Sequence, residues 1–388
     1  MSRSDGSPLF PYLDGVVATP FDGGLVLVRP AERRLCLLNG SGAAVWRLYH
    51  GEGSVERAAD LLAVAYGIGS EEAAAAVESS LAEWRSAGFL DPARPVRDRV
   101  EGSLPRPLPA PSSRQGTERS YRLGACSFRI LYGAAGLEDF VHPRLEHLSA
   151  ASLPGAPRIE IYAAGEGAIV SGTGGWDETA DGSEAIGLVF RRIVEILHPG
   201  ARWIAHLHAA AVGVGGATLL LPGAKGAGKS TLTAALVHAG AAYLSDDVVF
   251  LDDLCRAVSL PVRLALKEGS WKVVGELFPA LGRESVSALR SAPVRYLDPS
   301  PEAGTCEALP RPVRAIVFPR FLPGSAASLR PVPPGEALLR LVDDRAWLSW
   351  EEEDIGAWTR WLTEVPAYSL EYSTLPEAVS LALGAAGG

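Results

Sequence analysis

The stretch that decides the fold reads Ala217-Thr-Leu-Leu-Leu-Pro-Gly223-Ala-Lys-Gly-Ala-Gly228-Lys229-Ser230-Thr231. Its apolar beginning predicts a buried strand, and Leu232 and Leu236 after it have helical spacing. A strand, a glycine-rich loop and a helix in this order give the motif G-x-x-x-x-G-K-S its usual structural context. Glycines let the backbone wrap closely around phosphate with its N–H groups pointing inward, and the helix adds its positive end. The stretch therefore predicts an α/β domain with a nucleotide-binding loop, and its correct flanks argue against a chance glycine turn.

Each part of this loop has an expected role. Lys229 is expected to reach the β- and γ-phosphates, and Ser230 to bind Mg²⁺. Lys225 is not a motif position; its side chain either touches phosphate or faces solvent, and we favour solvent. The residues expected to hold the nucleotide are Gly223, Ala224, Lys225, Gly226, Ala227, Gly228, Lys229, Ser230 and Thr231.

Two adjacent carboxylates follow the next predicted strand. Residues 241–244 read as that strand, and Asp246 lies 17 residues after Lys229. Carboxylates at the carboxyl end of a strand, beside a phosphate loop, are placed to bind Mg²⁺ and to accept a hydroxyl proton. Asp246 and Asp247 can divide these two roles between them. A surface Asp-Asp turn is the competing interpretation.

Residues 203–212 predict a strand before the loop, and its alternation puts His206 and His208 on one face. A lone histidine on a strand is usually structural. His208 is therefore of interest only jointly with the aspartate pair.

His208, Lys229 and the pair Asp246-Asp247 together resemble the HPr kinase/phosphorylase superfamily, which is related to phosphoenolpyruvate carboxykinase. That family has a histidine on the strand before the loop, a loop of the form G-x-x-G-x-G-K-S, and an Asp-Asp pair after the next strand. The resemblance covers about residues 120–382 and implies an α/β P-loop kinase fold of this type, with ATP and Mg²⁺. It also implies that one aspartate is the general base, assisted by His208, and that the other binds Mg²⁺ with Ser230. We assign Asp247 as the base and Asp246 to the metal, although the sequence does not fix that order.

Two later segments extend the resemblance. Residues 315–320 are similar to a strand of HPr-kinase-like proteins, which makes Arg320 a candidate for stabilising the transferred phosphoryl group, with a surface arginine as the alternative. Residues 365–372 resemble the closing strand of that group. The second signature of true HPr kinases is missing, and Phe318-Pro319 stands where an acidic residue is expected. The chain is closer to the HPr-kinase-like proteins of peptide-modification clusters.

The first 90 residues predict a separate small domain. Strand-like runs within residues 15–38 precede three helices that begin near Ser41, Ser54 and Ser70, and residues 89–90 read as a short closing strand. This is a winged-helix-like α+β plan. Residues 37–46 and 88–90 resemble the PqqD-like domain, which binds leader peptides of ribosomally made, modified peptides. Such a peptide adds as a strand and rests on a helix.

The sequence thus divides into a winged-helix-like peptide-recognition domain, a linker and a P-loop domain. The linker is marked by recurrent proline with serine and glycine. We place the three parts at residues 1–92, 93–118 and 119–388.

Charge and apolar patterning exclude several classes of protein. The net charge is −9, and residues 1–92 hold seven arginines against twelve acidic residues, which disfavours nucleic acid as a partner. Only four of the 36 basic residues are lysines. We expect no membrane segment, since no apolar run reaches about 18 residues. The four cysteines are widely spaced and no signal peptide is evident, so we expect a cytoplasmic protein.

The function that fits these features is an ATP-dependent kinase acting on a Ser- or Thr-type hydroxyl. The substrate would be a precursor peptide or small protein captured by the PqqD-like domain, within a ribosomal peptide modification pathway. One alternative is a kinase of a small molecule, such as free serine or a sugar. Another is a nucleotide-dependent peptide chaperone without catalysis. The resemblance also leaves a homo-oligomer open, because HPr kinases form hexamers.

Overall fold

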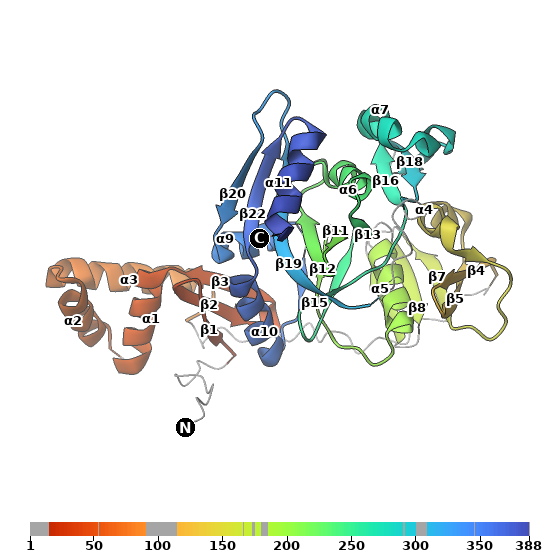
Figure 1. Cartoon of the computed structure of the whole chain (residues 1–388). Coiled ribbons are helices and arrows are strands. Elements are labelled where there is room, and N and C mark those ends of the chain that lie inside the picture. The colour runs from red at the N-terminus through yellow and green to blue at the C-terminus, as the bar shows by residue number, and fades with distance from the viewer. Residues whose placement is uncertain are drawn as a thin grey trace, which may run out of the picture. The chain divides into compact units, whose positions relative to one another are not determined.

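The computed structural model, drawn in Figure 1, describes residues 15–52, 54–90, 115–165, 167–172, 175–179, 185–289, 292–299, 309–344 and 346–387. These residues form two compact units. The first holds the described residues up to 90 together with Pro333–Glu336 and Ser349–Glu364, and the second holds the remainder. Most of the predicted linker, with the boundary at residue 92, lies outside the described residues.

The first unit is a three-stranded antiparallel sheet followed by three helices, completed by a fourth helix from far along the chain. The sheet has the order β1-β2-β3, so β1 and β3 are its edges. The fourth helix, α10, packs against β1. The elements are β1 (Val17–Phe21), β2 (Gly24–Arg29), η1 (Pro30–Glu32), β3 (Arg34–Leu38), α1 (Gly40–Glu52), α2 (Val55–Tyr66), α3 (Ser70–Ser86) and α10 (Glu352–Glu364).

Local sequence explains most of these boundaries. Ser54 caps α2 as predicted, and its side chain accepts a hydrogen bond from the Arg57 N–H at 3.3 Å. The predicted strand at residues 89–90 is wrong. Phe89 lies in a bend, its N–H bonds to the Trp84 carbonyl at 2.7 Å, and its ring is buried with Trp46 and Trp84. The apolar character of residues 89–90 thus reflects burial in the core and not strand pairing.

The second unit is built on a ten-stranded mixed sheet. Its main path runs β13-β11-β12-β19-β15-β14-β10-β21, and β22 pairs with both β19 and β20. The strands are β10 (Trp203–Leu207), β11 (Ala209–Val214), β12 (Ala217–Pro222), β13 (Ala242–Ser245), β14 (Val249–Asp252), β15 (Arg256–Val258), β19 (Arg311–Phe321), β20 (Ser328–Val332), β21 (Trp347–Leu348) and β22 (Ala367–Tyr372).

The predicted single strand over residues 203–212 is wrong, because the chain breaks at His208. β10 before the break pairs with β14 and β21, whereas β11 after it pairs with β12 and β13. The two halves thus take different neighbours, so alternation across the break no longer relates His206 to His208.

A smaller six-stranded sheet and a three-stranded sheet complete this unit. The six-stranded sheet has the order β6-β4-β5-β7-β8-β9, and the three-stranded sheet has the order β16-β18-β17. The remaining elements of the second unit are β4 (Thr117–Leu123), β5 (Cys126–Tyr132), α4 (Ala135–Leu145), η2 (Glu146–Leu148), β6 (Ser149–Ala150), β7 (Arg158–Ala164), β8 (Gly167–Gly172), β9 (Gly175–Thr179), α5 (Ala185–Leu197), α6 (Lys229–His238), β16 (Leu264–Lys267), α7 (Glu268–Leu277), η3 (Pro279–Arg283), β17 (Ser287–Leu289), β18 (Ala292–Leu297) and α11 (Leu375–Gly387). Helix α9 (Pro334–Asp343) begins in the first unit and continues into the second.

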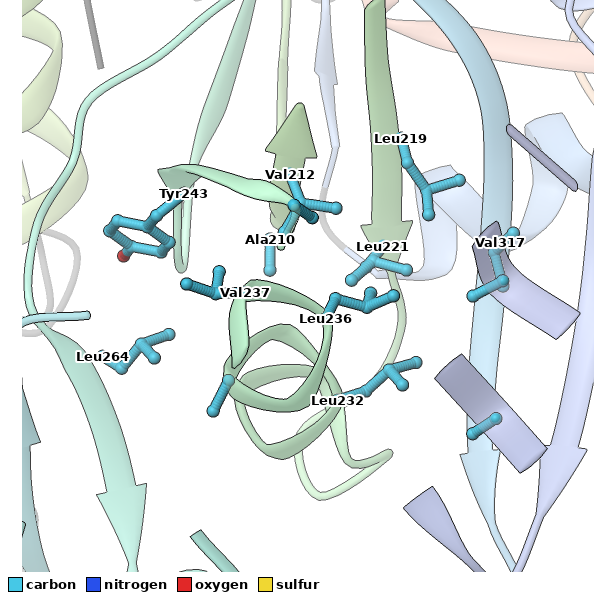
Figure 2. Close-up of a cluster of buried hydrophobic side chains, with 14 of the residues drawn as sticks. Ala210, Val212, Leu219, Leu221, Leu232, Leu236, Val237, Tyr243, Leu264 and Val317 are labelled. Carbon is cyan, nitrogen blue, oxygen red and sulfur yellow. The ribbon is translucent and has the colours of Figure 1, made fainter. Parts of the chain in front are cut away.

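Helix α6, which follows the glycine-rich stretch after β12, packs in an apolar core. Figure 2 shows side chains of α6, among them Leu232 and Leu236, facing Leu219 and Leu221 of β12. All four side chains are fully buried. This packing fixes the start of α6 relative to the end of β12, and so fixes the loop between them.

The chain is therefore a mixed α/β protein with several sheets. Within the described residues, no helix combines the length and the apolar character that a bilayer crossing requires.

Candidate active site

The candidate site lies where four strands of the large sheet end. β12, β19 and β22 are parallel, and β13 runs in the same direction because β11 lies antiparallel between it and β12. Their carboxyl ends therefore share one edge of the sheet. We call residues 223–231, which follow β12 at this edge, the glycine loop. The N–H of Phe321, at the end of β19, donates to the Ala227 carbonyl of this loop at 3.3 Å.

Glycine is required at the end of the loop. Gly228 has φ of 96° and is the N-cap of α6. A Cβ on this residue would collide with the hydroxyl of Tyr372, which donates to the Gly228 carbonyl at 3.4 Å. Positive φ and close approach together explain why the chain has glycine here.

Lys229 lies inside the glycine loop. Its Nζ donates to the carbonyls of Gly223 and Ala224, the second at 3.3 Å, and its side chain is buried. Burial lowers the pKa of Lys229, and the neighbouring charges of Asp246 and Asp247 oppose that shift. The ammonium is thus held in the loop by backbone oxygens and acidic neighbours.

Asp246 is buried beside the loop. Its two carboxylate oxygens each accept from Ser230 Oγ at 3.1 Å, and the Ala265 N–H lies 3.4 Å from Oδ2. Burial, and then repulsion from Asp247, raise the pKa of Asp246 to about 7. A hydroxyl and a carboxylate in contact beside a glycine loop form the donor set that Mg²⁺ takes together with phosphate oxygens, so these residues fit the metal.

Asp247, the next residue, has different surroundings from Asp246. The Val248 N–H bonds to the Asp246 carbonyl at 3.0 Å, across a turn in which Asp247 has φ of 73°. This is the φ of the strained γ-turn, a conformation that residues other than glycine rarely adopt. The side chain of Asp247 is 38% exposed, and its Oδ2 lies 3.7 Å from Arg144 Nε. The turn thus separates one buried carboxylate from one accessible carboxylate.

Besides Lys229 and Arg144, a third cation lies near the aspartate pair. Lys267 ends β16, and it shares a face of that strand with Ala265, which contacts Asp246. Burial lowers the pKa of Lys267, and repulsion from Lys225 and Lys229 adds to the shift. Two of the other three lysines, Lys225 and Lys229, are therefore close enough to Lys267 to interact with it.

The other predicted residues lie farther out. His208 occupies the break between β10 and β11 and is an electrostatic neighbour of Asp344. Arg320 is 65% exposed and pairs with Glu371 at 3.2 Å. Among the described residues, no hydrogen bond or ion pair joins Arg320 to the aspartate pair.

Three charged residues of the site were not predicted from the sequence. Burial raises the pKa of Asp344, and the charges of Lys229 and His208 oppose the shift, so Asp344 lies near both residues. Arg144 comes from helix α4, which packs against the six-stranded sheet, and no motif marks it. Lys267 alone had a signal, which was the rarity of lysine.

Residues 24–90 match the family model of coenzyme PQQ synthesis protein D (PqqD). The first unit therefore contains a PqqD-like domain, as the sequence resemblance predicted. No curated protein sequence matches the chain. Among solved structures, the Hpr(Ser) kinase/phosphatase from Coxiella burnetii is 10% identical with a TM-score of 0.22, over 46% of this chain and 91% of that chain. A score this low does not establish a shared fold.

Proposed function

We propose that the chain is an ATP-dependent kinase that phosphorylates a hydroxyl of a peptide or small protein held by its PqqD-like domain. The observation that carries the proposal is the divergence of Asp246 and Asp247 beside Lys229. One carboxylate is buried against Ser230, and the other is accessible. Phosphoryl transfer to a hydroxyl needs both, one for the metal and one for the proton.

In this mechanism Asp247 accepts the proton of the acceptor hydroxyl. The hydroxyl oxygen forms a bond to the γ-phosphorus of ATP as the bond between that phosphorus and the β,γ-bridging oxygen breaks, and ADP leaves with the electron pair. Lys229 stabilises the negative charge on the transferred group, and the backbone N–H groups of the glycine loop hold the phosphates. His208 would assist through Asp344, which lies near both His208 and Lys229.

Ser230 and Asp246 would hold Mg²⁺. When bound, the ion neutralises charge on the phosphate oxygens. The high pKa of Asp246 makes metal binding compete with a proton, so we expect Mg²⁺ to bind more weakly below pH 7.

The first unit offers a place for a peptide strand. β3 is an edge of its sheet, whereas the opposite edge strand, β1, packs against α10. An unpaired edge accepts an extended peptide through backbone hydrogen bonds. We propose that the leader of the substrate adds to β3 and delivers the acceptor hydroxyl to Asp247.

The test is incubation of the full chain with γ-labelled ATP and candidate precursor peptides. We expect label on the peptide with wild type and none with Asp247→Asn. A matched control is Asp253→Asn, because the chain has a second Asp-Asp pair at residues 252–253. There Asp252 accepts from the backbone and side chain of Arg256, both at 2.8 Å, and Asp253 is exposed. Equal loss in both variants, or no label with any peptide, would contradict the proposal.

A small-molecule kinase is the second candidate, and a leader peptide distinguishes it. Free leader should compete with peptide phosphorylation if the PqqD-like domain captures the substrate. Phosphorylation of serine or a sugar that is unaffected by the leader would favour the alternative. Nucleotide binding without any turnover would favour the chaperone.

A further inference from the structure

A buried arginine from the six-stranded layer reaches the aspartate pair. Arg144, near the end of α4, is only 3% exposed. Its Nη1 donates to the Phe140 carbonyl at 2.7 Å and to the Tyr296 hydroxyl at 3.0 Å. The guanidinium also lies over both aromatic rings, 5.4 Å from the centre of Phe140 and 5.2 Å from that of Tyr296. These contacts fix its plane and direction.

The backbone around Arg144 is anchored as firmly as its side chain. The Arg263 N–H donates to the Arg144 carbonyl at 2.8 Å, and Arg263 Nη2 donates to the Tyr296 carbonyl at 2.7 Å. His147 donates to the Pro261 carbonyl at 2.8 Å. The end of α4 is therefore attached to the segment that leads into β16, whose Ala265 N–H contacts Asp246.

One donor of this arginine has no hydrogen bond. Arg144 Nε is buried and has no partner among the described residues. The acid that faces it is Asp247, whose Oδ2 is 3.7 Å away, slightly beyond hydrogen-bond distance. A buried cationic N–H without a partner is destabilising. A short movement of Asp247 would complete the bond, whereas direct contact with substrate is excluded by the burial of Arg144.

We propose that Arg144 is a positioning residue for Asp247. Its Nε–H binds one carboxylate oxygen of Asp247 and turns the other oxygen toward the acceptor hydroxyl. Arg144 neither gains nor loses a proton, since the hydroxyl proton passes to Asp247. The strained turn at Asp247 aims the side chain, and Arg144 fixes its rotation. This inference rests on the proposed kinase activity. It adds to the site a residue of α4, which packs against the six-stranded sheet and not against the sheet that carries the glycine loop.

Steady-state kinetics of Arg144→Met and Arg144→Lys test the proposal. We expect kcat to fall about 10- to 100-fold in R144M while the KM for ATP changes less than about twofold, because positioning affects transfer and not nucleotide binding. R144K should recover little, since an ammonium lacks the planar fork.

A matched control separates positioning from folding. Arg192 of α5 is a similarly buried arginine, paired with Asp177 at 2.6 Å and with Glu195 at 2.7 Å. Arg192→Met should lower the melting temperature as R144M does, but should keep wild-type kcat. Guanidinium ion should also restore part of kcat to Arg144→Ala. Wild-type kcat in folded R144M, or equal kcat losses in R144M and R192M, would overturn the proposal.

A measurement without turnover distinguishes this failure from failure of the kinase proposal. Melting temperatures of R144M, D247N and the double variant show whether the two side chains interact. We expect the double variant to lose less than the sum of the single losses. Strictly additive losses would overturn the Arg144–Asp247 pairing even in an active kinase.

Discussion

Adjacent aspartates in this protein have different surroundings, and a turn with an unusual backbone angle lies at the second of them. Asp246 is buried against Ser230, whereas Asp247, which has a positive φ, is accessible and faces Arg144. Sequence shows two identical side chains and no sign of the turn between them. That the pair lies near Lys229 was predictable from its distance in sequence, but the different surroundings of the two carboxylates were not, because they depend on the backbone conformation.

The buried member of the pair should destabilise the nucleotide-free protein. The pKa of Asp246 rises from 3.8 to about 7, so the folded protein keeps this proton while the unfolded chain releases it. The contribution of the protonated Asp246 carboxyl to the free energy of unfolding is therefore fully present below pH 3.8 and is lost as the pH rises to 7. Asp246→Asn does not titrate, so in EDTA we expect its melting temperature to exceed that of wild type by at least about 5 °C at pH 8 and to match it near pH 4.

Thermal melts of both proteins from pH 4 to pH 8 check this expectation, with Asp253→Asn as the exposed control. A constant difference across that range would contradict the buried, proton-binding carboxyl.

Among the elements, β16 brings one of the unexpected charges to the site. It places Lys267 near the glycine loop, where repulsion from Lys225 and Lys229 contributes to its lowered pKa. A polyanion relieves such repulsion. We expect Lys267→Ala to weaken ATP binding about 10-fold, measured by calorimetry, with a smaller loss for ADP.

The fourth lysine provides the control for this experiment. Lys272 is exposed on α7, five positions after Lys267. Lys272→Ala should bind ATP as wild type does. Equal losses in the two variants would indicate a general charge effect and not a local site.

A second element, β10, carries a histidine that should make the fold sensitive to acid. His206 stacks on Trp347 with ring centroids 4.4 Å apart and lies 5.2 Å from the ring of Phe250. Burial, with repulsion from Arg191, lowers the pKa of His206 to about 3. Below pH 6.5 the His206 imidazole is protonated in the unfolded chain but stays neutral in the folded protein. The free energy of unfolding therefore falls as the pH falls from 6.5 toward 3.

His206→Phe should remove this contribution, which is at most about 1.4 kcal/mol for each pH unit. Urea unfolding at pH 7.5 and pH 5 gives the comparison. We expect a smaller drop in the variant than in wild type, whereas His238→Gln, at an exposed position, should drop as wild type does. Identical drops in H206F and wild type would contradict the lowered pKa.

The same strand shows the limit of prediction from periodicity. Residues on both sides of His208 do form strands, as the alternating run over residues 203–212 predicts. The two halves pair with different partners, however, and such long-range pairing leaves no local pattern in the sequence. The strand before the glycine loop and the helix after it were predictable, because both carry strong local signals. Arg144 was not predictable as a neighbour of Asp247, since its approach depends on how α4 and the six-stranded sheet pack beside the large sheet.

At the scale of the whole molecule, the chain passes between its two units several times. Pro333–Glu336 and Ser349–Glu364 belong with the first unit, whereas Ala337–Leu348 between them belongs with the second. No local pattern indicates this, because α10 reads as an ordinary amphipathic helix until its partner β1 is known.

Removing residues 1–90 should therefore damage more than peptide capture. The deletion takes away β1, against which α10 packs. The apolar residues of α10 that are buried in the intact protein are Ile355, Trp358, Trp361 and Leu362. We expect the truncated chain to bind 1-anilinonaphthalene-8-sulfonate and to elute as aggregates in gel filtration, whereas a truncated chain that stays monomeric and binds no dye would show that α10 does not need β1.

The repeated passage of the chain between its units also limits how such a protein can be recombined. A recognition module joined to an enzyme at one junction can be exchanged by a single gene fusion. Here a transplanted module would lack α10, which is encoded more than 250 codons downstream of β3. The first unit consists of three segments of the chain, so exchanging it between relatives of this architecture requires five coordinated junctions. The two units are therefore expected to be inherited as one block.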